Sequence, residues 1–164
     1  MTMTHDRPRL LIEDWLPVKA LGIESRRERA AASALPPLSF LHVWWARRPL
    51  VASAGAVLGS VMPTWSEDLA AAFPGEANLA TQDAYHQWFH ELCGILGDPI
   101  AARAALDAAN AAGTKLEGNG YGYPQAYKNS PSTADLNLLH QILEQTWTAL
   151  PSVIDTTAGG GSIP

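Results

Sequence analysis

The end of the chain constrains the fold most, because a short apolar run there leads into three glycines. Val153 and Ile154 precede the carboxylate of Asp155, and glycines occupy positions 159–161. This order is typical of a buried strand that turns into a helix beside a nucleotide cofactor. The glycines let the backbone approach a ligand closely. The pattern therefore predicts the first strand and glycine loop of an α/β cofactor fold, with a plain flexible tail as the alternative.

The predicted cofactor unit is incomplete. Pro164 stands before any helix that could follow the glycines. A doubly wound unit needs roughly 100 further residues beyond this point. We therefore expect the chain to be the N-terminal part of a larger protein.

The composition indicates a folded protein rather than a disordered one. Of the 164 residues, 47% are hydrophobic and only 16% are charged, which suffices for one sizeable core. No stretch approaches the roughly 18 apolar residues that span a bilayer, and the N-terminus lacks a signal-peptide core, so we expect a cytoplasmic protein. Cys93 is the only cysteine. A single cysteine excludes an internal disulfide and a cysteine-rich zinc site, and it favours a buried apolar role.

Positive charge is concentrated near the N-terminus. The net charge is −5, but residues 1–48 contain eight basic residues against five acidic ones, so that segment carries +3 and the remainder −8. The overall charge speaks against a nonspecific nucleic-acid binder, although a basic N-terminal third can face phosphates. A solvated helix face from Arg26 to Arg29 is the interpretation that we favour.

Helical segments separated by prolines and glycines account for most of the chain. The predicted helices cover residues 10–15, 23–34, 50–62, 66–73, 81–96, 98–113 and 132–150, and residues 38–45 are predicted to form a buried extended segment. Small residues dominate the helix 50–62, which predicts close packing against a neighbour. Residues 114–131 are rich in glycine and proline and predict a loop.

We divide the chain into three parts on this basis. Residues 1–63 are a predicted N-terminal helical segment, residues 64–150 a helical insertion, and residues 151–164 the truncated start of an α/β domain. The predicted fold of this chain is therefore mainly α.

A second cluster of chemically active residues lies at positions 41–50, which read Leu-His-Val-Trp-Trp-Ala-Arg-Arg-Pro-Leu. Two tryptophans, two arginines and a helix-starting proline bring aromatic surface, guanidinium donors and free helix-N-terminal amides close together. Such a corner can hold a carboxylate or a phosphate. In the alternative, Trp44 and Trp45 pack in the core while the arginines bond to nearby carbonyls or acids.

Four segments together are similar to a known family. They are Leu-Ile-Glu at 11–13, the string at 41–50, Gly-Asp-Pro at 97–99 and Asp-Thr-Thr-Ala-Gly-Gly-Gly-Ser-Ile-Pro at 155–164. With these segments the chain resembles, over essentially its whole length, the N-terminal region of adenine-specific DNA methylases. The Trp-Trp-Ala-Arg-Arg-Pro-Leu string is highly specific, whereas the glycine loop matches many cofactor folds.

The resemblance implies a Rossmann-like α/β methyltransferase fold that uses S-adenosylmethionine. It implies a cofactor loop from Asp155 to Ser162, and a basic corner in which Arg47 or Arg48 pairs with the methionine carboxylate. The implied cofactor residues are Asp155, Thr157, Ala158, Gly159, Gly161, Ser162, His42, Arg47, Arg48 and Pro49. The implied partners are DNA and the remainder of the methyltransferase domain, with the insertion either contacting DNA or covering the sheet.

The sequence departs from the family's pattern in three places. Thr157 stands where an aromatic is commonest, and Ala54 stands where an arginine is expected. The catalytic loop, an Asn or Asp followed by Pro-Pro and an aromatic, is missing, because the Pro-Pro at 36–37 lies between two leucines. That loop must hold the flipped adenine. We therefore assign no catalytic residue and expect the chain to be inactive alone.

The remaining chemical candidates favour structural roles. His86 and His90 lie four residues apart, but Gln87 stands where a zinc-protease helix has its glutamate, so we assign no metal site. The tyrosines at 121–127 can stack on bases, although a mobile surface loop is the interpretation that we favour.

The sequence thus predicts the N-terminal part of an S-adenosylmethionine-dependent DNA adenine methyltransferase, which transfers a methyl group to the adenine amino group. The alternative is a noncatalytic helical module whose basic N-terminal third binds nucleic acid or a partner protein.

Overall fold

The computed structural model describes residues 7–30, 49–116, 118 and 120–154. Within these ranges the regular structure is helical. The α-helices are α1 (Leu11–Asp14), α2 (Val18–Ala30), α4 (Leu50–Val61), α5 (Glu67–Ala72), α6 (Gln82–Leu92), α7 (Pro99–Ala111) and α8 (Thr133–Thr146), and the 3₁₀ helices are η2 (Ala77–Leu79) and η3 (Ala126–Lys128).

Local capping signals set the start of the later helices, as the sequence predicts. The Asp98 carboxylate accepts hydrogen bonds from the amides of Ile100 and Ala101 at 2.9 and 3.0 Å, with Pro99 at the first helical position. Ser132 and Asp135 form the predicted capping box at the start of α8. These contacts satisfy amides that a helix leaves without an internal partner.

Within the described ranges, three helix boundaries differ from the prediction by more than the one or two residues seen elsewhere. α2 begins at Val18 rather than residue 23, because the Leu21 amide already donates to the Pro17 carbonyl. α6 ends at Leu92 rather than residue 96, because Gly94 turns the chain with a φ of +80°. α8 ends at Thr146 rather than residue 150, because Trp147 takes an extended conformation.

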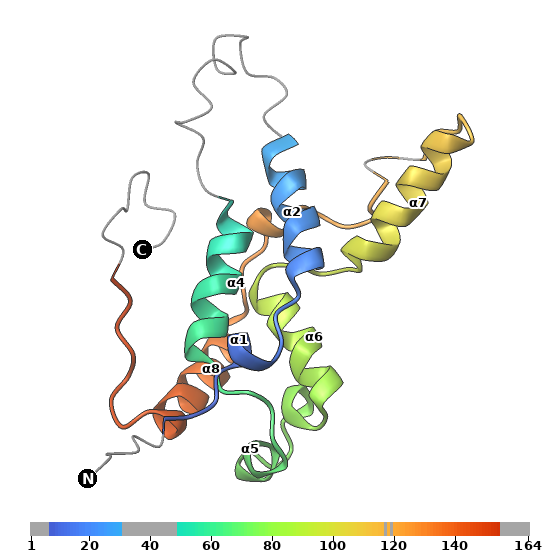
Figure 1. Cartoon of the computed structure of the whole chain (residues 1–164). Coiled ribbons are helices and arrows are strands. Elements are labelled where there is room, and N and C mark those ends of the chain that lie inside the picture. The colour runs from blue at the N-terminus through green and yellow to red at the C-terminus, as the bar shows by residue number, and fades with distance from the viewer. Residues whose placement is uncertain (1–6, 31–48, 117, 119, 155–164) are drawn as a thin grey trace.

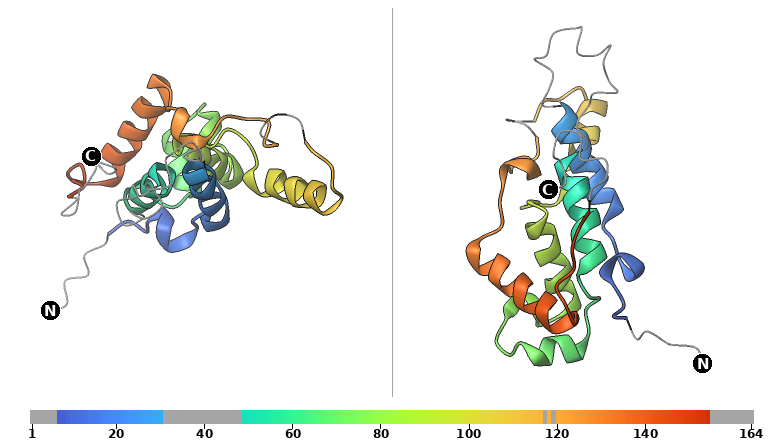
Figure 2. Two further views of the ribbon diagram at one scale, coloured as in Figure 1. Left: turned by 90° about the horizontal axis from the view of Figure 1, so that it is seen from above. Right: turned by 90° about the vertical axis from the view of Figure 1, so that its left-hand side faces the viewer.

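Helices α2 and α4 lie side by side, with α1 near the lower end of α4, and α7 and α8 extend on opposite sides of this body (Figures 1 and 2). The predicted close packing of the small-residue helix is confirmed in α4. A Cβ atom added at Gly55 would lie 2.7 Å from Leu21 Cδ1 of α2, and one added at Gly59 would lie 3.1 Å from Leu16 Cδ1. The missing side chains therefore let the backbones approach.

One hydrophobic cluster joins the first 63 residues to the rest of the described chain. Its largest fully buried side chains come from both parts and include Leu11, Val51, Met62, Leu79, Tyr85, Trp88, Phe89, Ile95 and Ile142. Cys93 is 5% exposed, which confirms its predicted burial.

Aromatic side chains tie the helices together through their polar atoms. Tyr85 donates its hydroxyl to the Pro63 carbonyl at 2.9 Å. Trp88 Nε1 donates to the Asp135 carboxylate at 2.8 Å, which joins α6 to α8. Aromatic groups of this kind add apolar burial to a satisfied hydrogen bond.

The predicted first strand of a Rossmann-like α/β fold is wrong for the residues described. Residues 151–154 have no regular structure, and Val153 and Ile154 are 47% and 84% exposed. The described ranges contain no strand and one isolated antiparallel bridge, between Leu10 and Pro63. An apolar run becomes a strand only when another strand satisfies its backbone groups. The part of the fold prediction that stands is the mainly α character.

The expected extended segment 38–45 and the glycine loop from residue 155 onward lie outside the described residues. Among the helices that the structure does describe, none has the length and apolar character needed to cross a membrane.

Candidate functional site

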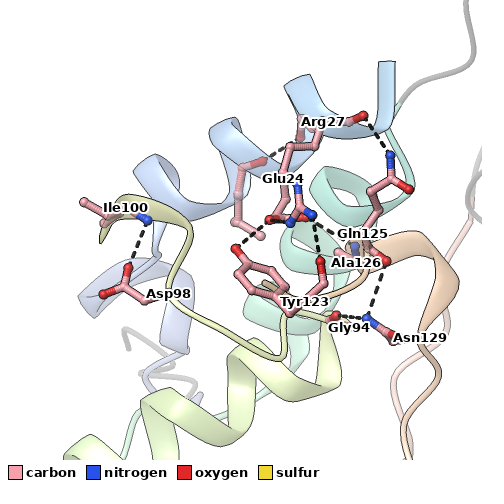
Figure 3. Close-up of polar contacts among 11 residues, drawn as sticks. Glu24, Arg27, Gly94, Asp98, Ile100, Tyr123, Gln125, Ala126 and Asn129 are labelled. Carbon is pink, nitrogen blue, oxygen red and sulfur yellow. Dashed lines mark hydrogen bonds and ion pairs between the residues drawn. The ribbon is translucent and has the colours of Figure 1, made fainter. Parts of the chain in front are cut away.

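A buried ion pair on α2 forms the centre of the polar contacts in the described structure (Figure 3). Glu24 is 1% exposed and Arg27 is 7% exposed. Glu24 Oε1 accepts hydrogen bonds from Arg27 Nη1 at 2.5 Å and from the Tyr123 hydroxyl at 3.0 Å, and Glu24 Oε2 accepts one from the Ala126 amide at 3.2 Å. Because the carboxylate is satisfied on both oxygens, its burial beside one cation is tolerated.

The loop after α7 is therefore anchored to α2. Arg27 Nη2 donates to the Tyr123 carbonyl at 3.0 Å, and the guanidinium lies 3.8 Å from the ring centroid of Tyr121 and 4.7 Å from that of Tyr123. Such cation–π contacts add to the hydrogen bonds. The favoured prediction of a surface loop at 121–127 agrees with the exposure of Gly122, Pro124 and Tyr127, but the rings of Tyr121 and Tyr123 lie against Arg27 of α2.

The Gly-Asp-Pro turn at 97–99 meets this cluster. A Cβ atom added at Gly97 would lie 2.3 Å from Cδ1 of Tyr123, so the tyrosine ring packs directly on the glycine backbone. Asn129 Nδ2 donates to the Gly94 carbonyl at 2.7 Å and fixes the end of the same loop (Figure 3). The Gly-Asp-Pro turn, one of the four segments that carry the resemblance, thus packs on Tyr123, which in turn is bound to α2.

The start of α4 is also held by α2, and this corrects one sequence expectation. The amides of Leu50 and Val51 donate to the two carboxylate oxygens of Glu28 at 3.0 and 3.4 Å. Pro49 is the N-cap of α4 rather than its first residue. Carboxylates are favoured at helix N-termini, and here the chain supplies its own. These two amides are therefore not free to bind the carboxylate of a cofactor.

The structure places Pro49 alone among the predicted cofactor residues. The others, His42, Arg47, Arg48, Asp155, Thr157, Ala158, Gly159, Gly161 and Ser162, lie outside the described residues. The proposed contact between the basic corner and the glycine loop thus stays a prediction.

His86 and His90 face the residues that connect α1 to α2. The His86 ring stacks on Trp15 with centroids 3.7 Å apart and planes 3° apart. Within the described structure, the Nε2 atoms of both histidines are buried without a hydrogen-bond partner. Burial lowers the pKa of both imidazoles, partly offset at His86 by the nearby carboxylates of Asp83 and Asp14. No group of three or more His, Cys, Asp or Glu side chains in the described ranges is arranged to hold a metal ion.

The favoured solvated face from Arg26 to Arg29 is only partly correct. Arg26 is exposed, but Arg27 is buried against Glu24. Arg26 also lines a groove with Lys19 of α2 and Arg103 of α7. Sequence reasoning missed this groove, because the predicted helix began after Lys19. The signal was nevertheless present, since residues 19, 22, 23 and 26 share one face of a helix.

Comparison with protein families gave one match, to a family described as "Protein of unknown function (DUF1156)", over residues 15–88. The matched segment contains Glu24, Arg27, Glu28 and the start of α4, but ends before α7 and the tyrosine loop. The comparisons with curated proteins and with solved structures gave no match. The chain is thus similar, over residues 15–88, to a family whose function is not defined.

Proposed function

We propose that this chain is the N-terminal helical part of a DNA adenine methyltransferase, which transfers a methyl group from S-adenosylmethionine to the adenine amino group. The sequence resemblance at 41–50 and 97–99 supports this assignment. One structural observation carries it further: a single helix, α2, binds Leu50 at the end of the first of these segments and Tyr123, whose ring packs on Gly97 of the second.

The two contacts come from consecutive turns of α2. Glu28 binds the amides of Leu50 and Val51, where the 41–50 segment enters α4. Glu24 binds Tyr123, whose ring packs on Gly97. Two segments that lie about 50 residues apart in sequence are thus tied to one rigid element.

In this proposal the residues of the chain position the basic corner rather than perform the chemistry. Glu28 binds the first amide of α4, directly after Pro49. Arg47 and Arg48 directly precede Pro49 in the sequence. S-adenosylmethionine would supply the methyl group. The amides at the start of α4 do not fit its carboxylate, because Glu28 already occupies them, so the proposed contact falls to the arginine side chains.

The alternative function is a noncatalytic helical module that binds nucleic acid. It is favoured by the absence of a strand from the described ranges and by the exposure of Val153 and Ile154. The two functions differ in whether a methyl group is transferred.

A methylation assay tests the proposal. The gene product that contains this chain is incubated with radiolabelled S-adenosylmethionine and adenine-containing duplex DNA. We expect label to appear in the DNA. The double variant R47A/R48A, which removes both arginines, should lower the methylation rate at least tenfold. A tenfold loss corresponds to about 1.4 kcal/mol of transition-state stabilisation. The control K115Q/K128Q removes the same charge from exposed positions and should retain the rate. DNA binding without methyl transfer would instead support the noncatalytic module.

A substitution of Glu28 tests its proposed positioning role. Glu28→Gln keeps an oxygen at the start of α4 but removes the charge that favours the helix N-terminus. We expect a reduced methylation rate with an unchanged helical circular dichroism spectrum. Glu67→Gln, at the exposed first turn of α5, should leave the rate as it is.

A further inference from the structure

An open groove lies between α2 and α7. In Figure 1 α2 stands upright near the centre and α7 slants away from it to the upper right. The volume of the groove is about 510 Å³. Lys19, Gly22 and Arg26 line it from α2, and Arg103 and Leu106 line it from α7. Closed pockets surround most of a small ligand, whereas an open groove suits a longer molecule that continues past both ends.

The groove is cationic although the chain as a whole has a net charge of −5. Four of its nine lining residues are basic and none is acidic. Arg27 is neutralised by Glu24, and Arg103 pairs with Asp107 at 2.7 Å on the exposed surface of α7. Lys19 and Arg26 have no ion-pair partner within the described part of the chain. Two positive charges therefore remain available for an anion.

The cations are spaced for more than one anionic group. Lys19 and Arg26 are seven residues apart on one helix face, which corresponds to about 10 Å along the axis. Arg103 stands on the opposite wall. Successive phosphates of one strand match the spacing of Lys19 and Arg26 without the two side chains having to bend toward each other.

The surface between the cations is apolar. Val18, Ile23 and Leu106 line it, Gly22 exposes backbone without a Cβ atom, and Tyr121 contributes an aromatic ring. A groove that combines backbone-tracking cations with apolar and aromatic surface is typical of single-strand binding. A duplex keeps its bases stacked inside and presents mainly phosphates to a surface of this kind.

We propose that the α2–α7 groove binds a single strand of nucleic acid, with Lys19 and Arg26 on its phosphates and its bases against Ile23, Leu106 and Tyr121. This inference deepens the proposed function and rests on its nucleic-acid part, because an adenine must leave the duplex stack before its amino group is methylated. It does not require that the chain itself transfers a methyl group.

Fluorescence anisotropy on the 164-residue chain tests the groove. The probes are a dye-labelled single-stranded DNA of mixed sequence and the same strand in a duplex, each titrated at several salt concentrations. We expect the single strand to bind at least tenfold more tightly than the duplex. K19Q/R26Q should weaken single-strand binding about tenfold and reduce the slope of log affinity against log salt by about 1.4, because two phosphate contacts are lost.

K115Q/K128Q is the matched control, since it removes the same charge from exposed residues outside the groove. It should change affinity less than twofold, and circular dichroism should show unchanged helix content in both variants. Equal losses in the two variants, tighter binding of the duplex, or no binding of either probe would overturn the groove assignment. The methylation assay is independent: methyl transfer that is unaffected by K19Q/R26Q would leave the proposed function standing while the groove fails.

Discussion

At the scale of single residues, Glu24 is a buried carboxylate that joins distant parts of the chain. Its two oxygens accept hydrogen bonds from a guanidinium, a phenol and a backbone amide, all at an exposure of 1%. Two of these donors come from about 100 residues further along the chain. A charge in this position therefore determines where the loop after α7 lies.

We predict that Glu24→Gln destabilises the chain by about 3–5 kcal/mol, because it leaves the buried guanidinium of Arg27 without a counter-charge. Urea denaturation followed by circular dichroism measures the change. Asp107→Asn is the control, since it breaks the exposed pair with Arg103 on the surface of α7 and should alter the midpoint little. A similar small shift for both variants would contradict the role of the buried pair.

Cys93 offers a second test at this scale. Burial raises the pKa of its thiol to about 12, and the thiolate is the reactive form. We predict that the native chain reacts only very slowly with a thiol reagent at neutral pH, and that the urea-unfolded chain reacts at once. Because Cys93 is the only cysteine, the absorbance of the released thiolate reports this residue alone. Complete labelling of the native chain within the mixing time would show that the site is open.

At the scale of the elements, the contact between α2 and α4 depends on glycine. Gly55 on α4 faces Leu21 of α2 so closely that a Cβ atom would lie 2.7 Å from Leu21 Cδ1. Gly22 is the immediate neighbour of Leu21 on α2, but a Cβ atom added there meets nothing within 4 Å. Replacing each glycine by alanine therefore separates the effect of packing on stability from the effect of helix propensity.

We predict opposite signs for Gly→Ala at these two positions. Gly22→Ala should stabilise the chain by about 0.5–1 kcal/mol, because alanine is the better helix former. Gly55→Ala gains the same propensity, but it forces the buried Leu21 to move, and we expect a net loss of about 1–2 kcal/mol. Thermal denaturation of the two variants measures both. Stabilisation by Gly55→Ala would mean that α2 and α4 are not packed as described.

At the scale of the whole molecule, α6 packs against the residues that connect α1 to α2. His86 and His90 of α6 lie against Trp15, with ring centroids 3.7 and 5.7 Å away. Desolvation lowers the pKa of both histidines below the ordinary 6.5. The carboxylates of Asp83 and Asp14 near His86, and those of Asp98 and Glu91 near His90, act in the opposite direction and only reduce the shift.

This packing predicts a loss of stability on mild acidification. The unfolded chain binds protons on these histidines near pH 6.5, whereas the folded chain binds them only at lower pH. The contribution of the two histidines to the free energy of unfolding is therefore complete above pH 6.5. It is lost as the pH falls through their pKa values in the folded chain. We expect the urea midpoint to drop between about pH 7 and pH 5, and H86Q/H90Q to reduce that drop.

The exposed His140 on α8 supplies the control for this pH experiment. His140→Gln should keep the full decrease, because its side chain is 54% exposed and is not desolvated as the two rings on Trp15 are. The carboxyl groups with lowered pKa values, Glu13 and Asp135, lose their contribution only below pH 4.5 and 3.8. They therefore act at more acidic pH than the histidines do. An unchanged midpoint in wild type from pH 7 to pH 5 would contradict the histidine packing.

The sequence by itself determined the features that depend on neighbours within one or two turns. The caps at Asp98 and Ser132 and the loop between α7 and α8 were predictable, because capping and glycine turns are local interactions. The burial of Cys93 followed from the ordinary behaviour of a lone cysteine.

Only the tertiary structure decided the features that need a partner from far along the chain. Val153 and Ile154 have the pattern of a buried strand, but the described residues supply no strand beside them, and they remain exposed. Arg27 has the appearance of a surface cation, yet Glu24, Tyr121 and Tyr123 enclose it. The amides at the start of α4 appeared free until Glu28 was found on them. In each case a local pattern sets what a group can do, and the long-range contact determines whether it is satisfied by the protein or left for a ligand.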